Sequence, residues 1–208
     1  VGAGMDITAA RRSDGVIEVW GDNQYGQHNV PALPPGVTYT KLAVGQQFLA
    51  ALRSDGVLVA WGYNWAGQCN VPLLAPGIAY VDVVLGGRHA IARRSDGIVV
   101  LWGWNLYGQI NMPAPPPGQA YARFSGGEFH TIALHTDGTP AAWGINDRGQ
   151  CNVPVLSPGV SYTQIAGGRA HTLALRSDGS LVAFGYNGSG QCNVPSGQFA
   201  VVCTGENH

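Results

Sequence analysis

The chain has 208 residues, of which 11% are charged and 45% hydrophobic, and its formal net charge is −1. This composition suffices for a packed core and excludes intrinsic disorder. No apolar run approaches the roughly 20 residues that cross a bilayer, so we expect no membrane insertion. The near-neutral balance, with Lys41 as the only lysine, argues against a nucleic-acid partner, because such partners are bound by clustered Lys and Arg.

Three short motifs recur along the chain with one period of 41 residues. The pair Trp-Gly begins at Trp20, Trp61, Trp102 and Trp143, with Phe184-Gly185 as a fifth variant. The pair Asp-Gly begins at Asp14, Asp55, Asp96, Asp137 and Asp178, and the pair Gly-Gln begins at Gly26, Gly67, Gly108, Gly149 and Gly190. Because three motifs keep the same period, the chain is a five-fold repeat with a unit of about 41 residues.

Each unit is predicted to consist of short β-strands, as its second copy illustrates. The predicted order is a strand at 41–44, a strand at 48–53, a hairpin turn at 54–56, a strand at 57–61, a loop at 62–67, a fourth strand at 68–71 and a proline-rich connector at 72–77. Asp-Gly favours the tight turn that joins antiparallel strands, and proline confines the connector to a loop or a sheet edge. No window of ten or more residues shows a helical period.

Short, evenly spaced strands with Gly and aromatic markers in every unit indicate a β-propeller or a β-solenoid. A unit of three hairpin-linked strands suits a propeller blade, whereas a solenoid coil is usually shorter. We therefore predict an all-β fold, a β-propeller of five repeats that forms a single domain over residues 1–208.

The two ends of the chain repeat each other. Phe199 aligns with Tyr162, Gly205 with Gly168 and His208 with His171, so residues 1–7 duplicate 202–208. We predict that the N- and C-terminal strands share one blade, with the C-terminal strand completing the blade of residues 8–31 and displacing the N-terminal stub. Two alternatives stay open: pairing of the C-terminal strand with another copy, which gives an oligomer or a filament, and a fragment of a longer propeller.

The repeat pattern resembles a known family. It reads Gly-x-x-His, followed by Ala-Leu-Arg-Ser-Asp-Gly-x-Leu-Val-Ala-Trp-Gly-x-Asn-x-x-Gly-Gln-Cys-Asn-Val-Pro, and it is similar to the regulator of chromosome condensation repeat over essentially the whole chain. The compact bacterial form, which includes β-lactamase inhibitor protein II, is the more similar one. The resemblance implies a propeller. It implies little about function, and family propellers commonly have seven blades where this chain has five units.

Most recurring residues are interpreted as structural. The Trp of each Trp-Gly pair is expected to pack between blades, and the recurring Asn and Gln to cap their own loops. Cys69, Cys151 and Cys192 share one repeat position, and we expect them and Cys203 to be free thiols. The histidines at another shared position are expected to bond to their own blades, with a metal or anion site as the alternative: His89, His130, His171 and His208. We predict no metal and no cofactor.

Function is expected where the repeats differ. The inner turns, between the first and second strands of each unit, vary most, together with the Trp-Gly loops that follow the third strands. Alternating strand direction places both kinds of loop on one face, opposite the Asp-Gly turns. The predicted partner-binding residues on that face are Tyr25, Tyr63, Trp65, Trp104, Leu106, Tyr107, Arg148 and Tyr186. Packing of some of these side chains back onto the blades is the alternative.

These features predict a binding scaffold rather than an enzyme, because no catalytic constellation recurs or stands alone in the sequence. We expect a protein partner, and inhibition of a secreted hydrolase is a specific form that the resemblance suggests. Carbohydrate binding by exposed Trp and Tyr, and assembly through the terminal strands, stay open as alternatives. Low charge and aromatic loops favour a secreted or cell-surface protein.

Overall fold

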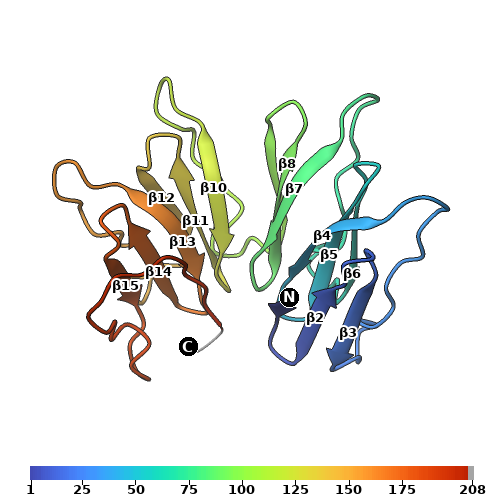
Figure 1. Cartoon of the computed structure of the whole chain (residues 1–208), viewed down its shortest axis with the longest axis horizontal. Helices are drawn as coiled ribbons and strands as arrows, with labels where there is room; N and C mark the ends of the chain where they lie inside the picture. Colours follow the sequence, from blue (N-terminus) through green and yellow to red (C-terminus); the bar gives the residue numbers. More distant parts are fainter. Residues whose placement is uncertain (206–208) are drawn as a thin grey trace. The chain divides into compact units, whose positions relative to one another are not determined.

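The computed structural model describes residues 1–205, and they form fifteen β-strands in five three-stranded antiparallel sheets (Figure 1). The prediction of an all-β fold with five repeats is therefore confirmed. The chain divides into two compact units, Val1–Trp104 and Asn105–His208. The single domain over residues 1–208 stays a prediction.

The first unit contains three sheets, which we call blades 1 to 3. Blade 1 is β1 (Gly2–Ala3), β2 (Ile7–Arg11) and β3 (Ile17–Gly21); blade 2 is β4 (Tyr39–Val44), β5 (Phe48–Arg53) and β6 (Leu58–Gly62); blade 3 is β7 (Tyr80–Leu85), β8 (His89–Arg94) and β9 (Val99–Gly103). In each blade the strands are neighbours in chain order, so every connection is a hairpin.

The second unit contains two sheets with the same strand order. Blade 4 is β10 (Tyr121–Gly126), β11 (His130–His135) and β12 (Pro140–Gly144), and blade 5 is β13 (Tyr162–Gly167), β14 (His171–Arg176) and β15 (Leu181–Gly185). The strands of blades 2 to 5 keep the 41-residue spacing, so the sequence period is also the structural period.

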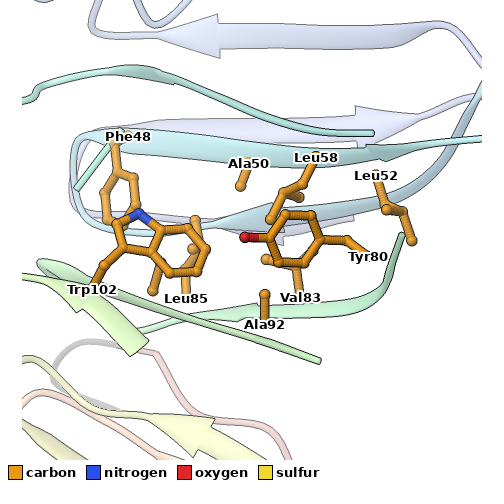
Figure 2. Close-up of a cluster of buried hydrophobic side chains, with 10 residues drawn as sticks. Phe48, Ala50, Leu52, Leu58, Tyr80, Val83, Leu85, Ala92 and Trp102 are labelled. Carbon is orange, nitrogen blue, oxygen red and sulfur yellow. The ribbon is translucent and has the colours of Figure 1, made fainter. Parts of the chain in front are cut away.

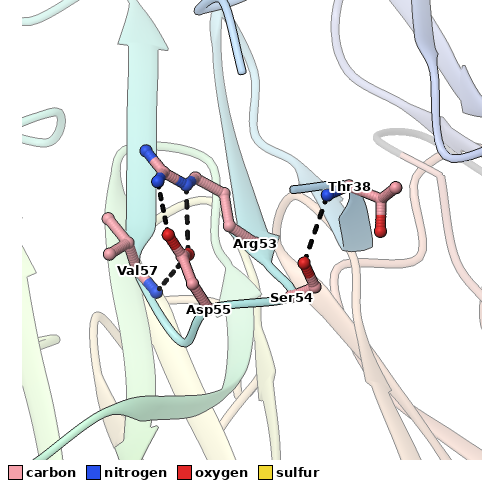
Figure 3. A network of polar contacts seen from close by, with 5 residues as sticks. All are labelled: Thr38, Arg53, Ser54, Asp55 and Val57. Carbon is pink, nitrogen blue, oxygen red and sulfur yellow. Dashed lines mark hydrogen bonds and ion pairs between the residues drawn. The ribbon is translucent and has the colours of Figure 1, made fainter. Parts of the chain in front are cut away.

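The hairpin between the second and third strands of a blade is fixed by its Asp-Gly pair, as blade 2 shows (Figure 3). The Asp55 carboxylate accepts a hydrogen bond from the Val57 amide at 3.3 Å and pairs with the Arg53 guanidinium. That hydrogen bond from Arg53 lowers the pKa of Asp55. Gly56 supplies the positive φ of the turn, at 80°. The Ser54 hydroxyl oxygen accepts from the Thr38 amide at 3.1 Å, which attaches the turn to the incoming connector.

The core lies between consecutive blades. Strand β5 is buried on both faces, which explains its continuous apolar run. Phe48, Ala50 and Leu52 pack against Val83 and Trp102 of blade 3 (Figure 2). The alternate residues of the strand, Leu49 and Ala51, pack against blade 1. Each buried large side chain stabilises the fold by about 1.5–3 kcal/mol, so blade-to-blade packing supplies the hydrophobic free energy that a single thin sheet cannot.

The Trp of the Trp-Gly pair joins one blade to the one before it, as predicted. The indole N–H of Trp102 donates to the backbone carbonyl of Gln68 at 3.0 Å, and only 7% of this Trp is exposed. Trp61 and Trp143 donate in the same way to the carbonyls of Gln27 and Gln109. Trp20 departs from this pattern, because 50% of it is exposed.

The predicted fourth strand at 68–71 is wrong. These residues form turns instead, in which the Asn70 amide donates to the Gly67 carbonyl and the Val71 amide to the Cys69 carbonyl. The backbone groups of this segment are thus bonded locally or to loop side chains rather than to a neighbouring strand.

The predicted sharing of one blade by both termini is not what the structure shows. Residues 2–3 form β1 and pair with β2, and the Gly4 amide donates to the Ile7 carbonyl, so the stub is not displaced. Pairing with a neighbouring hairpin strand closes a short loop, which favours it entropically over a distant segment.

The C-terminal segment nevertheless follows the predicted alignment. The Phe199 amide donates to the Gly179 carbonyl, as the Tyr162 amide does to Gly138 in the preceding repeat. The Gln164 side chain holds the next residues, because it donates to the Ala200 carbonyl and accepts from the Val202 amide. Residues 199–205 form no strand, and the match proposed for His208 lies outside the described residues.

The glycine that follows each Trp has a positive φ, and substituting it measures how much the fold depends on this backbone conformation. Gly103 has φ of +102°, and a Cβ there would lie 2.9 Å from the Arg88 carbonyl oxygen. Gly77 also has a positive φ, +81°, but a Cβ there would meet nothing within 4 Å. We predict that Gly103→Ala lowers the free energy of unfolding by roughly 3 kcal/mol and Gly77→Ala by only about 1 kcal/mol. Urea denaturation of both variants measures this difference, and equal losses would contradict it.

Candidate functional site

The two kinds of variable loop lie at the same edge of each sheet, as strand direction predicts. The first residue after each Trp-Gly pair donates its backbone N–H to a carbonyl of the inner turn in the same blade: Tyr63 to Gln47, Trp104 to Arg88, Ile145 to Phe129, and Tyr186 to Ala170. The Asp-Gly turns join the opposite ends of the strands. We call the edge that carries the inner turns and the Trp-Gly loops the loop edge.

Each Trp-Gly loop is held by an Asn and a Gln that recur in every repeat. In blade 2 the Asn64 side-chain oxygen accepts from the Cys69 amide at 2.8 Å, and its side-chain nitrogen donates to Asn70 at 2.9 Å. The Gln68 side-chain oxygen accepts from the Ala66 amide, and Gln68 is only 1% exposed. These bonds confirm the predicted capping roles. They fix the loop backbone while leaving the side chains between Asn and Gln free to vary.

In the first unit the loop edge carries two pairs of aromatic rings in tilted contact. The rings of Tyr25 and Tyr63 lie 4.5 Å apart between centroids, and those of Trp65 and Trp104 lie 4.8 Å apart. Each pair joins the loops of two consecutive blades. We call these four residues the unit 1 aromatic cluster. Trp65 is 69% exposed and Tyr25 38% exposed, whereas Tyr63 and Trp104 are half-buried beneath them.

The indole nitrogen of Trp104 is buried and has no hydrogen-bond partner. The Arg88 guanidinium, from the inner turn of blade 3, lies 6.0 Å from the Trp104 ring centroid. Its Nε donates to the Gln46 side-chain oxygen at 3.3 Å. Arg88 of the inner turn therefore makes a cation–π contact with the aromatic cluster. The sequence did not assign this role to Arg88.

In the second unit the loop edge is less aromatic and carries more charge. Arg148 lies over the Tyr186 ring at 5.5 Å, and its guanidinium is 3.6 Å from the Asp147 carboxylate. The Tyr107 ring meets Phe129 edge-on at 5.3 Å, and Leu106 is 70% exposed. The predicted residues at the loop edge of these later loops are all exposed: Leu106, Tyr107, Arg148 and Tyr186.

The eight predicted residues all lie in Trp-Gly loops, and none of them is buried. The structure pairs seven of them with a ring or cation of another loop or turn, and the exception is Leu106. Their role in partner binding stays a prediction. Phe129 belongs to a variable inner turn, so the variability between repeats could have identified it as a candidate site residue. Its contact with Tyr107 could not be predicted, because it depends on a distance between two loops.

The recurring histidines are buried, with at most 1% exposure at His89, His130 and His171. Their expected bonding within one blade is wrong for His130, whose Nε2 lies 3.0 Å from the Thr172 hydroxyl of the next blade. Since that hydroxyl donates to the Gln150 carbonyl, His130 Nε2 must carry the proton and donate to Thr172. Within residues 1–205, no three His, Cys, Asp or Glu side chains gather in a way that would hold a metal ion.

The four cysteines are free thiols, as predicted. Burial raises the pKa of Cys69 to about 12 and that of Cys151 to about 11, so both stay protonated and unreactive near neutral pH. In each case the sulfur lies 3.4 Å from a carbonyl oxygen of its own loop, Tyr63 or Ile145. Cys69 and Cys151 therefore belong to loop packing rather than to a chemical site.

The fold and the loop edge together define a class: an all-β repeat protein of the propeller type, with conserved spacing in its blades and variable side chains on one edge. The family description "Regulator of chromosome condensation (RCC1) repeat" matches residues 80–109 and 162–191. Other blades carry the same motifs in the same register. This match confirms, for these two repeats, the resemblance inferred from the sequence.

Solved structures support the same fold. Prp20p from Saccharomyces cerevisiae superposes with a TM-score of 0.78 at 18% identity, over 94% of this chain and 59% of that one. The ectodomain of the receptor kinase CR4 from Physcomitrella patens gives 0.75 at 22% identity, over 98% and 55%. The ectodomain of the Arabidopsis thaliana receptor kinase ACR4 gives 0.72 at 19% identity, over 98% and 70%.

The chain thus spans somewhat over half the length of the first two structures, and at these identities the likeness concerns the fold alone. The search of curated proteins gave no match. Among the described residues, no helix is long and apolar enough to cross a membrane.

Trp102 and Trp104 differ in whether their indole N–H makes a hydrogen bond within the fold, so the two can be compared by mutation. Trp102→Phe leaves the Gln68 carbonyl without its donor, so we predict that it lowers the free energy of unfolding by about 2 kcal/mol. Trp104→Phe removes a buried N–H that has no partner, so we expect a change smaller than about 1 kcal/mol. Chemical denaturation with fluorescence and circular dichroism measures both, and a larger loss for Trp104→Phe would contradict the assignment.

Burial lowers the pKa of His130 to about 4, and the neighbouring His171 lowers it further in the same direction. The unfolded chain therefore takes up a proton near its ordinary pKa of about 6.5, before the folded chain does. We predict that stability is complete above this value, falls as the pH drops from about 6.5 to about 4 by roughly 3 kcal/mol for this residue, and then levels off.

His130→Phe tests this dependence, because Phe48 fills the equivalent position in blade 2 with 0% exposure. The melting temperature of the variant should fall less between pH 7 and pH 4 than that of the original chain. Parallel profiles for the variant and the original chain would show that His130 does not titrate as described.

Proposed function

We propose that the chain is a non-enzymatic binding scaffold that recognises a protein partner through its loop edge, with the unit 1 aromatic cluster as the main contact. The observation that supports this most directly is Trp65, which is 69% exposed although its ring contacts that of Trp104. Leaving a large aromatic side chain in water forgoes about 1.5–3 kcal/mol of burial free energy. Exposed aromatic groups on a soluble surface commonly mark a site that is covered by a partner.

The ring contacts within the cluster also favour binding, because they reduce the conformational entropy that is lost when a partner binds. Each outer ring rests on an inner ring from the next blade, and the loop backbone is fixed by the Asn and Gln side chains. A partner therefore immobilises little that is not already ordered, and Tyr and Trp offer large contact areas at low entropic cost.

Similar structures support a protein partner rather than a small substrate. The published description of Prp20p refers to its binding properties to Gsp1p and histones. Two other similar structures are receptor-kinase ectodomains, which supports our proposal of a secreted or cell-surface location. Inhibition of a secreted hydrolase is the specific form of binding that we propose to test first.

The unequal distribution of rings favours protein over carbohydrate. The junctions between blades 1 and 2 and between blades 2 and 3 carry ring pairs, whereas the junction between blades 4 and 5 carries Arg148 over Tyr186. A multivalent lectin would be expected to repeat one sugar-binding site in each blade, while a single asymmetric protein surface requires no such repetition.

Affinity capture from extracellular extract of the source organism tests the proposal, with the double variant Trp65→Ala/Trp104→Ala as the comparison. We expect the original chain to retain a partner that the double variant loses, with at least a tenfold rise in Kd by calorimetry, about 1.4 kcal/mol, since clustered Trp side chains carry much of an interface's energy. Leu73→Ala is the matched control, because Leu73 is an apolar residue, 100% exposed, in a connector.

The proposal is wrong if the double variant remains folded by circular dichroism and still retains the partner. A glycan array with the same three proteins covers the alternative: binding of an oligosaccharide, lost in the double variant only, would replace the protein partner by a carbohydrate. Assays of secreted hydrolases, β-lactamases included, test the inhibitor form separately, and their failure leaves protein binding itself unaffected.

A further inference from the structure

The loop edge of blade 5 carries a tripeptide of a kind that occurs once in the sequence. Asn187-Gly188-Ser189 is the only Asn-x-Ser or Asn-x-Thr triplet, with x other than proline, in the 208 residues. Such a triplet is the acceptor of N-linked oligosaccharides in secreted proteins, and it is used on surface loops. All three residues are exposed, in the loop that follows β15. Their place in the fold therefore leaves room for a bulky modification.

Exposure of the acceptor asparagine is a property of the repeat and does not depend on its being in the last blade. The residues at the same position in the other four repeats are also exposed: Asn23, Asn64, Asn105 and Asn146. None of these completes an acceptor triplet, because the second residue after each is neither Ser nor Thr: Tyr25, Ala66, Tyr107 and Arg148. The loop of blade 5 thus combines the shared loop geometry with a serine that the other repeats lack.

The acceptor nitrogen can take a sugar without losing the bond that holds the loop. The Asn187 side-chain oxygen accepts from the Cys192 amide at 2.8 Å, and its Nδ2 donates to the Asn193 side-chain oxygen at 2.9 Å. Nδ2 carries two hydrogens, and within residues 1–205 only one of them is used in a hydrogen bond. Transfer of an oligosaccharide replaces one hydrogen, so one remains for the bond to Asn193.

The serine hydroxyl has no structural role in the loop. The Ser189 backbone N–H donates to the Gln191 side-chain oxygen at 2.8 Å, and the Ala66 amide makes the same bond to Gln68 in blade 2, so this bond requires no hydroxyl. Among the described residues the Ser189 hydroxyl makes no hydrogen bond. Gly188, by contrast, is explained by packing, because a Cβ there would collide with the Tyr186 hydroxyl. The fold therefore accounts for the asparagine and the glycine of the triplet but not for its serine.

We propose that Asn187 is a site of N-linked glycosylation. The proposal rests on the secreted or cell-surface location proposed above, because the transferase acts on chains that enter the secretory pathway. The donor is an oligosaccharide carried on a lipid pyrophosphate. A bond forms between Asn187 Nδ2 and C1 of the first sugar, and the bond from C1 to the pyrophosphate oxygen breaks. The pyrophosphate leaves with the electron pair, and the amide gives up one proton.

A glycan at Asn187 also bears on which part of the loop edge can meet a protein partner. Asn187 directly follows Tyr186, whose ring is the one that Arg148 covers. A bulky, hydrophilic oligosaccharide on the next residue restricts access to that ring. The loops of the unit 1 aromatic cluster contain no acceptor triplet. The modification is thus consistent with the unit 1 aromatic cluster as the main contact.

Secretion of the whole chain from a eukaryotic cell line, behind a cleavable signal, tests the proposal. We expect an intact mass raised by one N-linked oligosaccharide, which peptide-N-glycosidase removes with conversion of Asn187 to Asp. Ser189→Ala should abolish the modification, and Ser189→Thr should retain it. Because Ala66 fills the same position in blade 2, Ser189→Ala should unfold at the same temperature as the original chain after enzymatic removal of the glycan.

Gly36→Asn supplies a positive control on the same chain. It creates a second triplet with Val37 and Thr38, in a connector where Gly36 and Thr38 are exposed. The φ of Gly36 is +77°, and a Cβ there would meet nothing within 4 Å. Asparagine adopts this left-handed conformation more readily than most residues that have a side chain. The secreted variant should therefore carry two oligosaccharides.

Two outcomes would overturn the proposal. The first is a secreted, folded chain that is unmodified at Asn187, and occupancy of the new site in Gly36→Asn would show that the transferase acts on this chain elsewhere. The second is an oligosaccharide that Ser189→Ala retains. Both are separate from the test of partner binding, because Trp65→Ala/Trp104→Ala leaves the triplet intact and should be glycosylated like the original chain.

Discussion

The hydrogen bond from a Trp indole to the Gln carbonyl of the preceding blade is the constraint on which the rest of the structure depends. A three-stranded sheet of five or six residues per strand is too thin to enclose a core, so each blade must be buried by its neighbours. The Trp ring supplies the largest apolar surface for this packing, and its N–H requires an acceptor once it is buried. The Gln carbonyl meets that requirement in three of the repeats at 2.8–3.0 Å.

The same Gln connects the core to the loop edge. Its backbone carbonyl faces the next blade, while its side-chain oxygen accepts a backbone N–H from its own Trp-Gly loop, as Gln68 does from Ala66. Packing of the next blade therefore also holds the loop that carries the exposed side chains. This arrangement explains how the exposed Trp65 can stand in solvent on a backbone that is held by hydrogen bonds.

The sequence predicted those features that depend on local geometry. The 41-residue period, the Asp-Gly hairpins and the shared edge of the variable loops all follow from residue type and strand direction. The predicted fourth strand at 68–71 does not form, because side chains such as Asn64 bind the backbone that a strand partner would have needed. The shared blade was predicted from duplication of the ends, but duplication does not decide which copy pairs with β2.

Ring pairing at the loop edge could not be predicted from the sequence, because each pair joins two positions in different blades. Each pair joins a residue four or five positions after the Trp of one blade to the residue two positions after the Trp, or Phe184, of the next blade. Trp65 meets Trp104 in this way, and Arg148 meets Tyr186. Where that second residue is Ile145, Tyr107 turns to Phe129 of the inner turn instead. Since the Asn and Gln that fix the loops do not take part in these pairs, the chemistry of each junction can change without cost to the blades. The specificity of the proposed binding therefore belongs to junctions between blades rather than to single blades.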